Sequence, residues 1–203
     1  MIKLFVLGDS ISIHYGPYLE ELSKGKFLYS RKTGKEPEWV EVDKSDMGDN
    51  GGNSWLVLQY LNTMKDIIRP EIFLVNCGLH DIRMVSGADK APVSIEEYAE
   101  NLQKIIQLGR EIAKHLIWVT TTDFDEKRHN SYDTGYARYE KDNLAYHQKA
   151  LEVMAENKVS VIDLRGFTET LGGNIFVDHV HFTEEVRKKQ AGFIFNELEK
   201  LGY

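Results

Sequence analysis

The chain is 203 residues long, is 42% hydrophobic and 28% charged, and carries a formal net charge of −7 from 32 acidic and 25 Lys/Arg residues. This length and composition are typical of one globular domain with a substantial core, so we expect residues 1–203 to form a single domain. The acidic balance argues against nucleic acid or an anionic membrane surface as a partner.

Cys77 is the single cysteine and lies in an apolar run, which excludes an internal disulfide and predicts a buried thiol. The N-terminal segment lacks the basic start and long apolar stretch of a signal peptide. No apolar run approaches the ~20 residues that span a bilayer. We therefore expect a cytoplasmic protein without membrane contact, and the sequence indicates no particular oligomeric state.

Strands and helices alternate along the chain. The apolar run 2–7 predicts a buried strand, and apolar residues at helical spacing follow it, at Tyr15, Tyr18, Leu19 and Leu22. Residues 27–47 predict a strand, a turn and a second strand. A glycine-rich loop over 48–54 then precedes a helix that ends at Pro70.

The second half continues the alternation, with a buried strand at 72–77 and a capping-box pattern, Ser94-Ile95-Glu96-Glu97, that begins a helix. We expect further elements in the order strand, helix, strand and helix, over 116–122, 136–157, 159–164 and from Thr183, the N-cap of the last helix. The polar segment 123–135 has no period and is a candidate lid. This order predicts a parallel sheet with helices on both faces.

Ser10 lies where the first strand passes into the first helix, within Gly8-Asp9-Ser10-Ile11. In an open α/β sheet such turns lie at the carboxyl edge of the strands, where ligands bind, and helix N-terminal amides there favour an anion. Ser10 is therefore a candidate nucleophile whose own N–H faces the developing charge. The alternative is that these residues only turn the chain and cap a helix.

Asp178 and His181 lie three residues apart, just before the final helix. Asp178 can hold the imidazole in one tautomer while His181 takes the proton from Ser10. An isolated histidine here would more often be a helix-cap or partly buried residue. His179 and His181 are also a candidate metal-ligand pair, but no cysteine or compact carboxylate cluster completes a shell, so we expect no metal.

Together these segments resemble the GDSL-type, or SGNH, family of serine esterases, whose four blocks are built around Ser, Gly, Asn and His. The blocks occur in order over the whole chain, as Gly8-Asp9-Ser10-Ile11, Gly48-Asp49-Asn50-Gly51, Gly78-Leu79-His80-Asp81 and Asp178-His179-Val180-His181. The resemblance implies a flavodoxin-like three-layer α/β/α sandwich with a central parallel sheet, the SGNH hydrolase fold. It also implies that no metal or organic cofactor is needed.

The resemblance implies two-step acyl transfer from a small-molecule or carbohydrate ester. Ser10, Asp178 and His181 would form the catalytic triad, and the amides of Ser10 and Gly51 would hold the oxyanion. The sequence departs from the family at His80, which stands where the family has an oxyanion-binding asparagine. A neutral imidazole has one N–H to donate, so we expect an oxyanion or substrate-contact role for His80.

The family resemblance suggests short acyl esters, including acetyl groups on sugars, and does not choose among them. Candidate substrate contacts flank the blocks at Asp9, His14, Asn53 and Asp81, whereas Trp55, at a helix start, is expected in the core. Two alternatives remain. One is a non-hydrolytic α/β domain that binds a small anionic ligand at the Gly48–Gly52 loop, which lacks P-loop and dinucleotide spacing. The other is an interaction module that has lost activity, with His80 as the sign of the loss.

Overall fold

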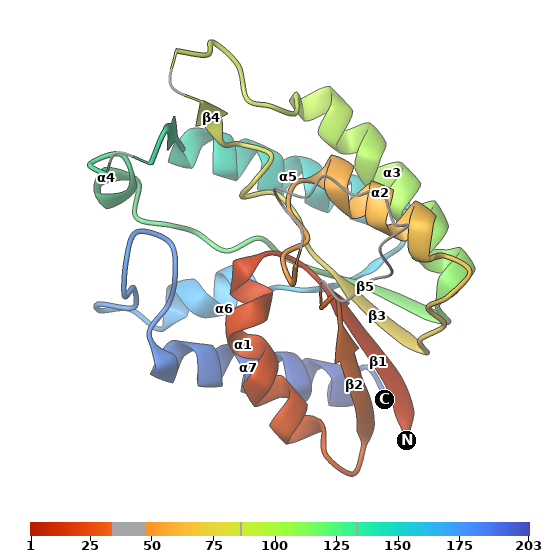
Figure 1. Cartoon of the computed structure of the whole chain (residues 1–203). Coiled ribbons are helices and arrows are strands. Elements are labelled where there is room, and N and C mark those ends of the chain that lie inside the picture. The colour runs from red at the N-terminus through yellow and green to blue at the C-terminus, as the bar shows by residue number, and fades with distance from the viewer. Residues whose placement is uncertain (34–47, 86, 133) are drawn as a thin grey trace.

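A five-stranded parallel sheet forms the centre of the chain in the computed structural model, which describes residues 1–33, 48–85, 87–132 and 134–203 (Figure 1). The strand order across the sheet is β2-β1-β3-β5-β7, and every neighbouring pair runs parallel. The five strands are β1 (Ile2–Leu7), β2 (Phe27–Arg31), β3 (Ile72–Val75), β5 (His115–Val119) and β7 (Ser160–Ile162). Their carboxyl ends therefore meet along one edge.

Helices cover both faces of this sheet (Figure 1). One layer contains α1 (Ser10–Ser23), α6 (Leu164–Thr170) and α7 (Glu184–Lys200), in which α7 packs against both α1 and α6. The other layer contains α2 (Ser54–Met64), α3 (Ile95–Ile112) and α5 (Glu140–Glu156), in which α3 lies between the other two. The flavodoxin-like three-layer α/β/α sandwich expected from the sequence is confirmed.

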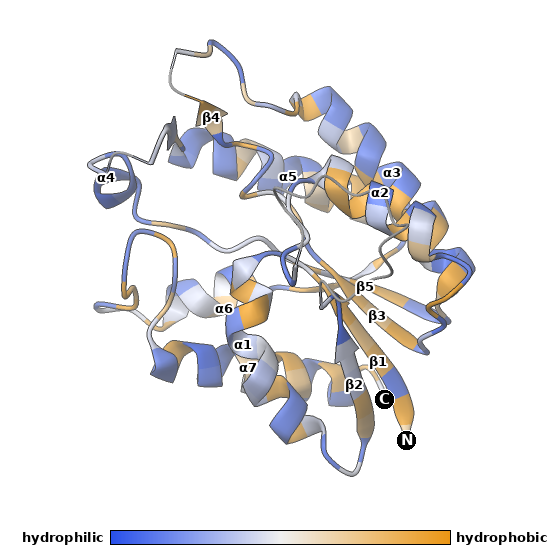
Figure 2. Cartoon of the chain, viewed as in Figure 1, coloured by the Kyte–Doolittle hydropathy of each residue, from blue (hydrophilic) through white to orange (hydrophobic). Residues whose placement is uncertain are grey.

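The strands β1, β3 and β5 are largely apolar, as their orange colour in Figure 2 shows. All four residues of β3 and the last four of β1 are buried, as is Trp118 on β5. A parallel sheet covered by helices on both sides needs such unbroken apolar runs, which is why these strands lack an alternating pattern. Cys77 is buried just beyond β3, as expected. The packed sheet gives its carboxyl edge a rigid base.

Side-chain caps fix where the helices begin. The carboxylate of Asp9 accepts from Ile11 N–H at 3.0 Å to start α1, and the amide oxygen of Asn53 accepts from Leu56 N–H at 3.0 Å to start α2. The capping box at the start of α3 and the Thr183 cap of α7 are confirmed. Each such cap contributes about 1 kcal/mol. Asp9 and Asn53 thereby define the loops at the sheet edge.

A second, two-stranded sheet lies beside that edge. Strand β4 (Met84–Val85) pairs antiparallel with β6 (Tyr136–Ala137), in the register Met84 with Ala137 and Val85 with Tyr136. The short helix α4 (Glu126–His129) precedes β6 and contains the fully buried His129. Helix α5 therefore begins at Glu140 and not at 136. Strands of two residues are too short to produce a readable period, so the sequence suggested only an aperiodic lid here.

Other boundaries also differ from expectation. Helix α2 ends at Met64, well before Pro70, and the strand expected over 159–164 ends at Ile162, with α6 beginning at Leu164. Trp55 is 49% exposed because its place in the first turn of α2 directs it away from the core. The second strand expected within 34–47 lies outside the described residues. Among the helices that the structure describes, none has the length and apolarity needed to cross a membrane.

Candidate active site

Ser10 and His181 meet at the carboxyl edge of the sheet although 171 positions separate them in sequence. Ser10 is the first residue of α1, directly after the turn that leaves β1, and His181 lies just before α7. Ser10 Oγ lies 2.9 Å from His181 Nε2, and His181 Nδ1 lies 2.7 Å from Asp178 Oδ2. The packing of α1 against α7 sets this geometry.

The surroundings of Asp178 fix the tautomer of His181. Asp178 Oδ1 accepts from the backbone N–H groups of Val180, at 2.8 Å, and of His181, at 2.7 Å. Partial burial opposes ionisation of Asp178, but these bonds and the His181 ring hold the pKa of the carboxyl below its ordinary value. An ionised carboxylate only accepts, so His181 Nδ1 carries the proton and Nε2 presents a lone pair to the Ser10 hydroxyl.

A cavity of about 220 Å³ opens beside Ser10 and His181. Four of its lining residues, Asp9, Ser10, Leu79 and His80, come from the sequence blocks near the first and third strands. The complete lining is Asp9, Ser10, Asn50, Leu79, His80, Arg83, Tyr136, Arg138, His179, Val180 and His181. The two arginines and the tyrosine were not found from the sequence. Arg83 has a local signal, since it lies three residues after His80, but nothing in the sequence near Arg138 marks it.

His80 is a neutral hydrogen-bond donor in this cavity. Its Nδ1 lies 3.1 Å from an Nη1 of Arg83, and a guanidinium only donates, so Nδ1 is the acceptor. The proton of the neutral ring is therefore on Nε2. Burial lowers the pKa of His80 to about 3, and the charges of Arg138 and Arg83 add to this effect. The ring thus keeps a single N–H near neutral pH.

The place of Gly51 corrects one expectation. Its N–H donates to the carbonyl oxygen of Gly8 at 2.8 Å, so it is not free to bind an oxyanion. A Cβ at Gly51 would come within 3.1 Å of that oxygen, which explains the glycine by close backbone approach. The next amide, of Gly52, donates at 2.8 Å to the side-chain oxygen of Asn50, a residue of the cavity wall.

Two of the expected substrate contacts are placed elsewhere. Asp81 is fully buried and does not line the cavity, and both its carboxylate oxygens accept from Ser54 N–H, at 2.9 and 3.1 Å. Burial raises the pKa of Asp81 to about 7. His14 packs its ring against that of His181, with centroids 4.6 Å apart, and also lies outside the cavity lining.

Asp9 and Asn53 do reach the cavities at the sheet edge. Asp9 is 2% exposed, and burial raises the pKa of its carboxyl above the ordinary value. Asn53 lines a neighbouring cavity of about 200 Å³ that shares His80 and Arg83 with the first. Both side chains are already engaged as helix caps, so contact with a substrate would be an additional role.

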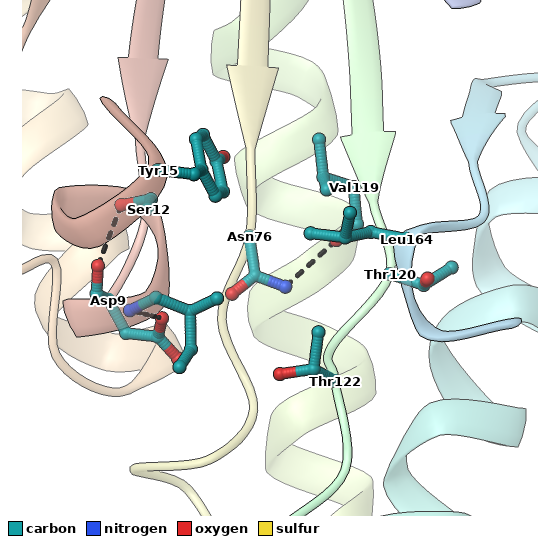
Figure 3. Close-up of a pocket in the computed structure, with 9 residues that line it drawn as sticks. Asp9, Ser12, Tyr15, Asn76, Val119, Thr120, Thr122 and Leu164 are labelled. Atoms are coloured by element: carbon teal, nitrogen blue, oxygen red, sulfur yellow. Dashed lines mark hydrogen bonds between the residues drawn. The ribbon is translucent and has the colours of Figure 1, made fainter. Parts of the chain in front are cut away.

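A smaller cavity of about 10 Å³ lies behind the nucleophile turn, among Asp9, Ser12, Tyr15, Asn76, Val119, Thr120, Thr122, Leu164 and Ile11 (Figure 3). Two hydrogen bonds brace its walls, from Ser12 Oγ to the carbonyl of Asp9 at 2.7 Å and from Asn76 Nδ2 to the carbonyl of Val119 at 2.8 Å. The space is about that of one water molecule. This cavity is therefore too small for a substrate and is part of the packing behind the turn.

His179 belongs to the cavity wall. Its ring packs edge-on against His129, with centroids 4.5 Å apart, and also contacts Tyr132. Within the described ranges, no three His, Cys, Asp or Glu side chains gather closely enough to hold a metal ion. The neighbouring histidines at 179 and 181 thus have different surroundings, the first aromatic and the second hydrogen-bonded to Ser10 and Asp178.

A flavodoxin-like α/β/α sandwich with a hydroxyl–imidazole–carboxylate arrangement at a strand-to-helix turn is typical of a serine hydrolase. A family model, GDSL-like Lipase/Acylhydrolase, matches residues 4–194. The chain belongs to this family and is an enzyme that hydrolyses ester bonds. A serine triad and an oxyanion hole are typical of its members.

Solved structures share the fold over nearly the whole chain. The lipase/acylhydrolase from Enterococcus faecalis has a TM-score of 0.71 at 17% identity, covering 98% of this chain and 96% of that chain. The acetyl xylan esterase AlAXEase has a TM-score of 0.67 at 16% identity, covering 97% and 100%. A catalytic mutant of Axe2, an acetylxylan esterase from Geobacillus stearothermophilus, has a TM-score of 0.65 at 15% identity, covering 97% and 94%. No curated protein matches the chain by sequence.

Proposed function

We propose that the chain is a serine esterase that hydrolyses short-chain acyl esters, with carbohydrate O-acetyl groups among them, through an acyl-enzyme on Ser10. The continuous arrangement of Ser10, His181 and Asp178, with contacts of 2.9 and 2.7 Å, carries this proposal. Each contact is within the range of a hydrogen bond that moves or orients a proton. The reaction needs no metal or organic cofactor.

In the first step, Ser10 Oγ forms a bond to the ester carbonyl carbon while its proton passes to His181 Nε2. The tetrahedral intermediate collapses, the ester C–O bond breaks, and His181 gives the proton to the leaving alcohol. In the second step, water attacks the acyl-serine with its proton taken by the same nitrogen. Collapse releases the carboxylic acid and returns the proton to Ser10. The carboxylate of Asp178 stabilises the imidazolium at each stage.

We assign three donors to the oxyanion. Since Ser10 is the first residue of α1, its own N–H has no acceptor within the helix. The Nε2–H of His80 is the second donor that we assign, in place of the family's amide side chain. The amide of Gly52, now bonded to Asn50, is the third, because the oxyanion can replace the Asn50 oxygen as its acceptor. Removing one such donor costs roughly 10²–10³ in kcat.

The size and chemistry of the cavity support short acyl groups. Its volume of about 220 Å³ and its polar lining fit an acetyl or similarly small acyl group better than a long alkyl chain. Two of the structural neighbours are named acetyl xylan esterases, which favours an acetyl ester on a carbohydrate as the substrate class.

The loop at Gly48–Gly52 offers little to a free anion. The amide of Gly51 already donates to the backbone of Gly8, and the amide of Ser54 just beyond the loop donates to Asp81; the amide of Gly52 has a displaceable acceptor, the Asn50 side chain. An anion-binding nest needs successive free N–H groups, and one exchangeable amide does not supply them. The intact hydrogen-bonded triad likewise argues against an interaction module that has lost its chemistry.

A fluorophosphonate probe and 4-nitrophenyl acetate test the proposal. The wild-type chain should be labelled and should hydrolyse the ester, and Ser10→Ala should lose both properties while its circular dichroism spectrum is unchanged. Ser160→Ala, an exposed serine at the start of β7, is the matched control and should behave as wild type. Wild-type turnover by a folded Ser10→Ala protein would exclude Ser10 as the nucleophile.

A further inference from the structure

We propose that the enzyme prefers esters that carry a carboxylate, and that Arg83 and Arg138 bind this carboxylate in the cavity beside Ser10. This inference rests on the proposed esterase function and specifies that the substrate carries a negative charge. Neither arginine belongs to the triad or to the oxyanion donors assigned above. Both line the cavity that contains Ser10 and His181.

The small second sheet brings these two arginines together. Arg83 directly precedes β4 and Arg138 directly follows β6, and the antiparallel register pairs Met84 with Ala137. The next position along the ladder therefore places Arg83 opposite Arg138. Tyr136 lies between the two charges, with its ring centroid 4.3 Å from the Arg83 guanidinium carbon and 5.0 Å from that of Arg138.

This arrangement has two positive charges and little to balance them. Like charges directly opposite one another destabilise an antiparallel pair, and Arg138 is only 4% exposed. Within the described part of the chain, neither guanidinium forms a salt bridge; Arg138 Nε donates to the carbonyl of Leu79 at 2.7 Å, and Arg83 donates to His80. The carboxyl of Asp9 favours the charge of Arg138 from a distance, but it accepts from Ile11 N–H and forms no salt bridge with either arginine.

Arg165 shows what a structural arginine looks like in the same protein. Its guanidinium bonds both Asp123, at 3.1 Å, and Glu169, at 2.9 Å. A buried charge without such a partner costs free energy. Groups kept at such a cost are characteristic of functional sites. A carboxylate on the substrate would supply the missing counter-charge, and the planar guanidinium fork suits it through paired hydrogen bonds.

The charge of the site also contrasts with that of the whole chain, whose formal net charge is −7. An acidic protein repels anions in general, so a cationic cavity is useful only where an anion must be selected. Arg83 lies at the junction with the second cavity, of about 200 Å³, which also contains Asn53, Pro92 and Val85. A carboxylate held at this junction leaves the ester within the same cavity as Ser10 and leaves room for the remainder of the substrate in the second.

Two matched ester pairs test the preference, because the carboxylate can belong to either half of the substrate. The first pair is 4-acetoxybenzoate and its methyl ester, and the second is 4-nitrophenyl hydrogen adipate and 4-nitrophenyl methyl adipate. In at least one pair, wild-type kcat/KM should be about tenfold higher for the charged member, the effect of a charge-assisted hydrogen bond. High salt should reduce the preference.

Arg83→Gln is the diagnostic variant, because glutamine keeps a donor for His80 Nδ1 and removes the charge. It should bring the charged-to-neutral ratio of kcat/KM close to one. Arg69→Gln, an exposed arginine next to Asp66, makes the same change in net charge and should leave the ratio unchanged. Equal kcat/KM within both pairs for the wild type, or an unchanged ratio in Arg83→Gln, would overturn the proposal.

Binding separates this inference from the proposed reaction. Calorimetric titration of Ser10→Ala with the same four esters measures recognition without turnover. Tighter binding of a charged member, lost when Arg83→Gln is added, would support the carboxylate site whether or not the wild type hydrolyses any ester. Absence of hydrolysis by the wild type would refute the esterase function alone. Hydrolysis of the neutral esters with equal binding of charged and neutral members would refute the carboxylate site and leave the esterase function standing.

Discussion

The amide of Gly51 donates a hydrogen bond to the carbonyl oxygen of Gly8 over 2.8 Å. This bond joins the loop that leads into α2 to the turn that carries the nucleophile. It makes Gly51 a structural link between two of the four sequence blocks, and it fixes the position of Ser10, two residues after Gly8, relative to the neighbouring amide of Gly52.

Gly51→Ala should therefore reduce turnover by moving the nucleophile turn. Its Cβ would lie 3.1 Å from the Gly8 oxygen, and that oxygen belongs to the backbone and cannot rotate away. We expect kcat on 4-nitrophenyl acetate to fall about tenfold, since small displacements of reacting groups are costly. Gly192→Ala in α7, where a Cβ meets open space, is the control and should keep full activity. Equal activity of the two variants would contradict this role for Gly51.

The two histidines near the C-terminal helix should differ sharply on substitution. His181→Ala removes the base bonded to Ser10 and Asp178, so kcat/KM should fall by several orders of magnitude. His179→Ala removes only an aromatic contact in the cavity wall and should cost far less. Kinetics of both variants on one short ester measure the difference, and added imidazole should partly restore His181→Ala. A larger loss in His179→Ala would show that the wrong ring was assigned.

His80→Asn should retain much of the wild-type activity, because an amide N–H replaces the Nε2–H donor. His80→Ala should lose on the order of 10²-fold in kcat, the usual effect of one missing oxyanion donor. Turnover on the same ester compares the three proteins. If both variants match the wild type, His80 is not a donor and the oxyanion depends on backbone amides.

The pH profile gives a second check on His80. At the sequence level an imidazole is expected to titrate near neutrality. In the folded chain, burial and the two arginines lower the pKa of His80 to about 3, so the ring stays neutral between pH 5 and pH 8. Wild type and His80→Asn should therefore show the same pH dependence of kcat/KM over this range. A limb near neutral pH that disappears in His80→Asn would contradict the lowered pKa.

Asp81 should make the protein less stable as the pH rises. Its folded-state pKa of about 7 is above the ordinary value of 3.8, so the folded chain holds the proton more tightly than the unfolded chain. This contribution is complete below the unfolded value and is lost as the pH rises through about 7. Relative to Asp81→Asn, the wild type should lose on the order of a few kcal/mol of unfolding free energy between pH 4 and pH 8.

Urea denaturation at several pH values measures that difference. Asp66→Asn, an exposed carboxylate next to Arg69, is the matched control and should show a nearly constant offset from the wild type. A pH-independent difference between wild type and Asp81→Asn would refute the raised pKa of Asp81.

The alternating fold could be predicted from the sequence because its strands are buried on both faces and its helices carry recognisable caps. The places of Ser10 and His181 followed from the same logic, since parallel strands direct their carboxyl ends to one edge. Arg138 could not be found this way. It reaches the cavity through a two-residue strand pair whose register depends on tertiary contacts and leaves no period in the sequence.

The sequence also does not reveal which side chains and amides near the site already have hydrogen-bond partners. Asp81 and Gly51 stand in the expected blocks, but only the structure shows that Asp81 accepts from the Ser54 amide and that Gly51 N–H is bonded to Gly8. An aromatic residue at a helix start, such as Trp55, is expected in the core, yet the first turn of a helix has an outward side as well. Residue type and spacing indicate which groups are near the site, whereas their hydrogen bonds within the protein determine which of them can still bind the substrate or the oxyanion.

The packing of α1 against α7 has a consequence for how the protein is made. Ser10 leaves the ribosome well before its base, which follows 171 positions later beside α7. The nucleophile therefore remains an ordinary alcohol until that later segment has been made and α7 has docked on α1. Esterase activity of nascent chains stalled at increasing lengths should appear abruptly once α7 has cleared the exit tunnel.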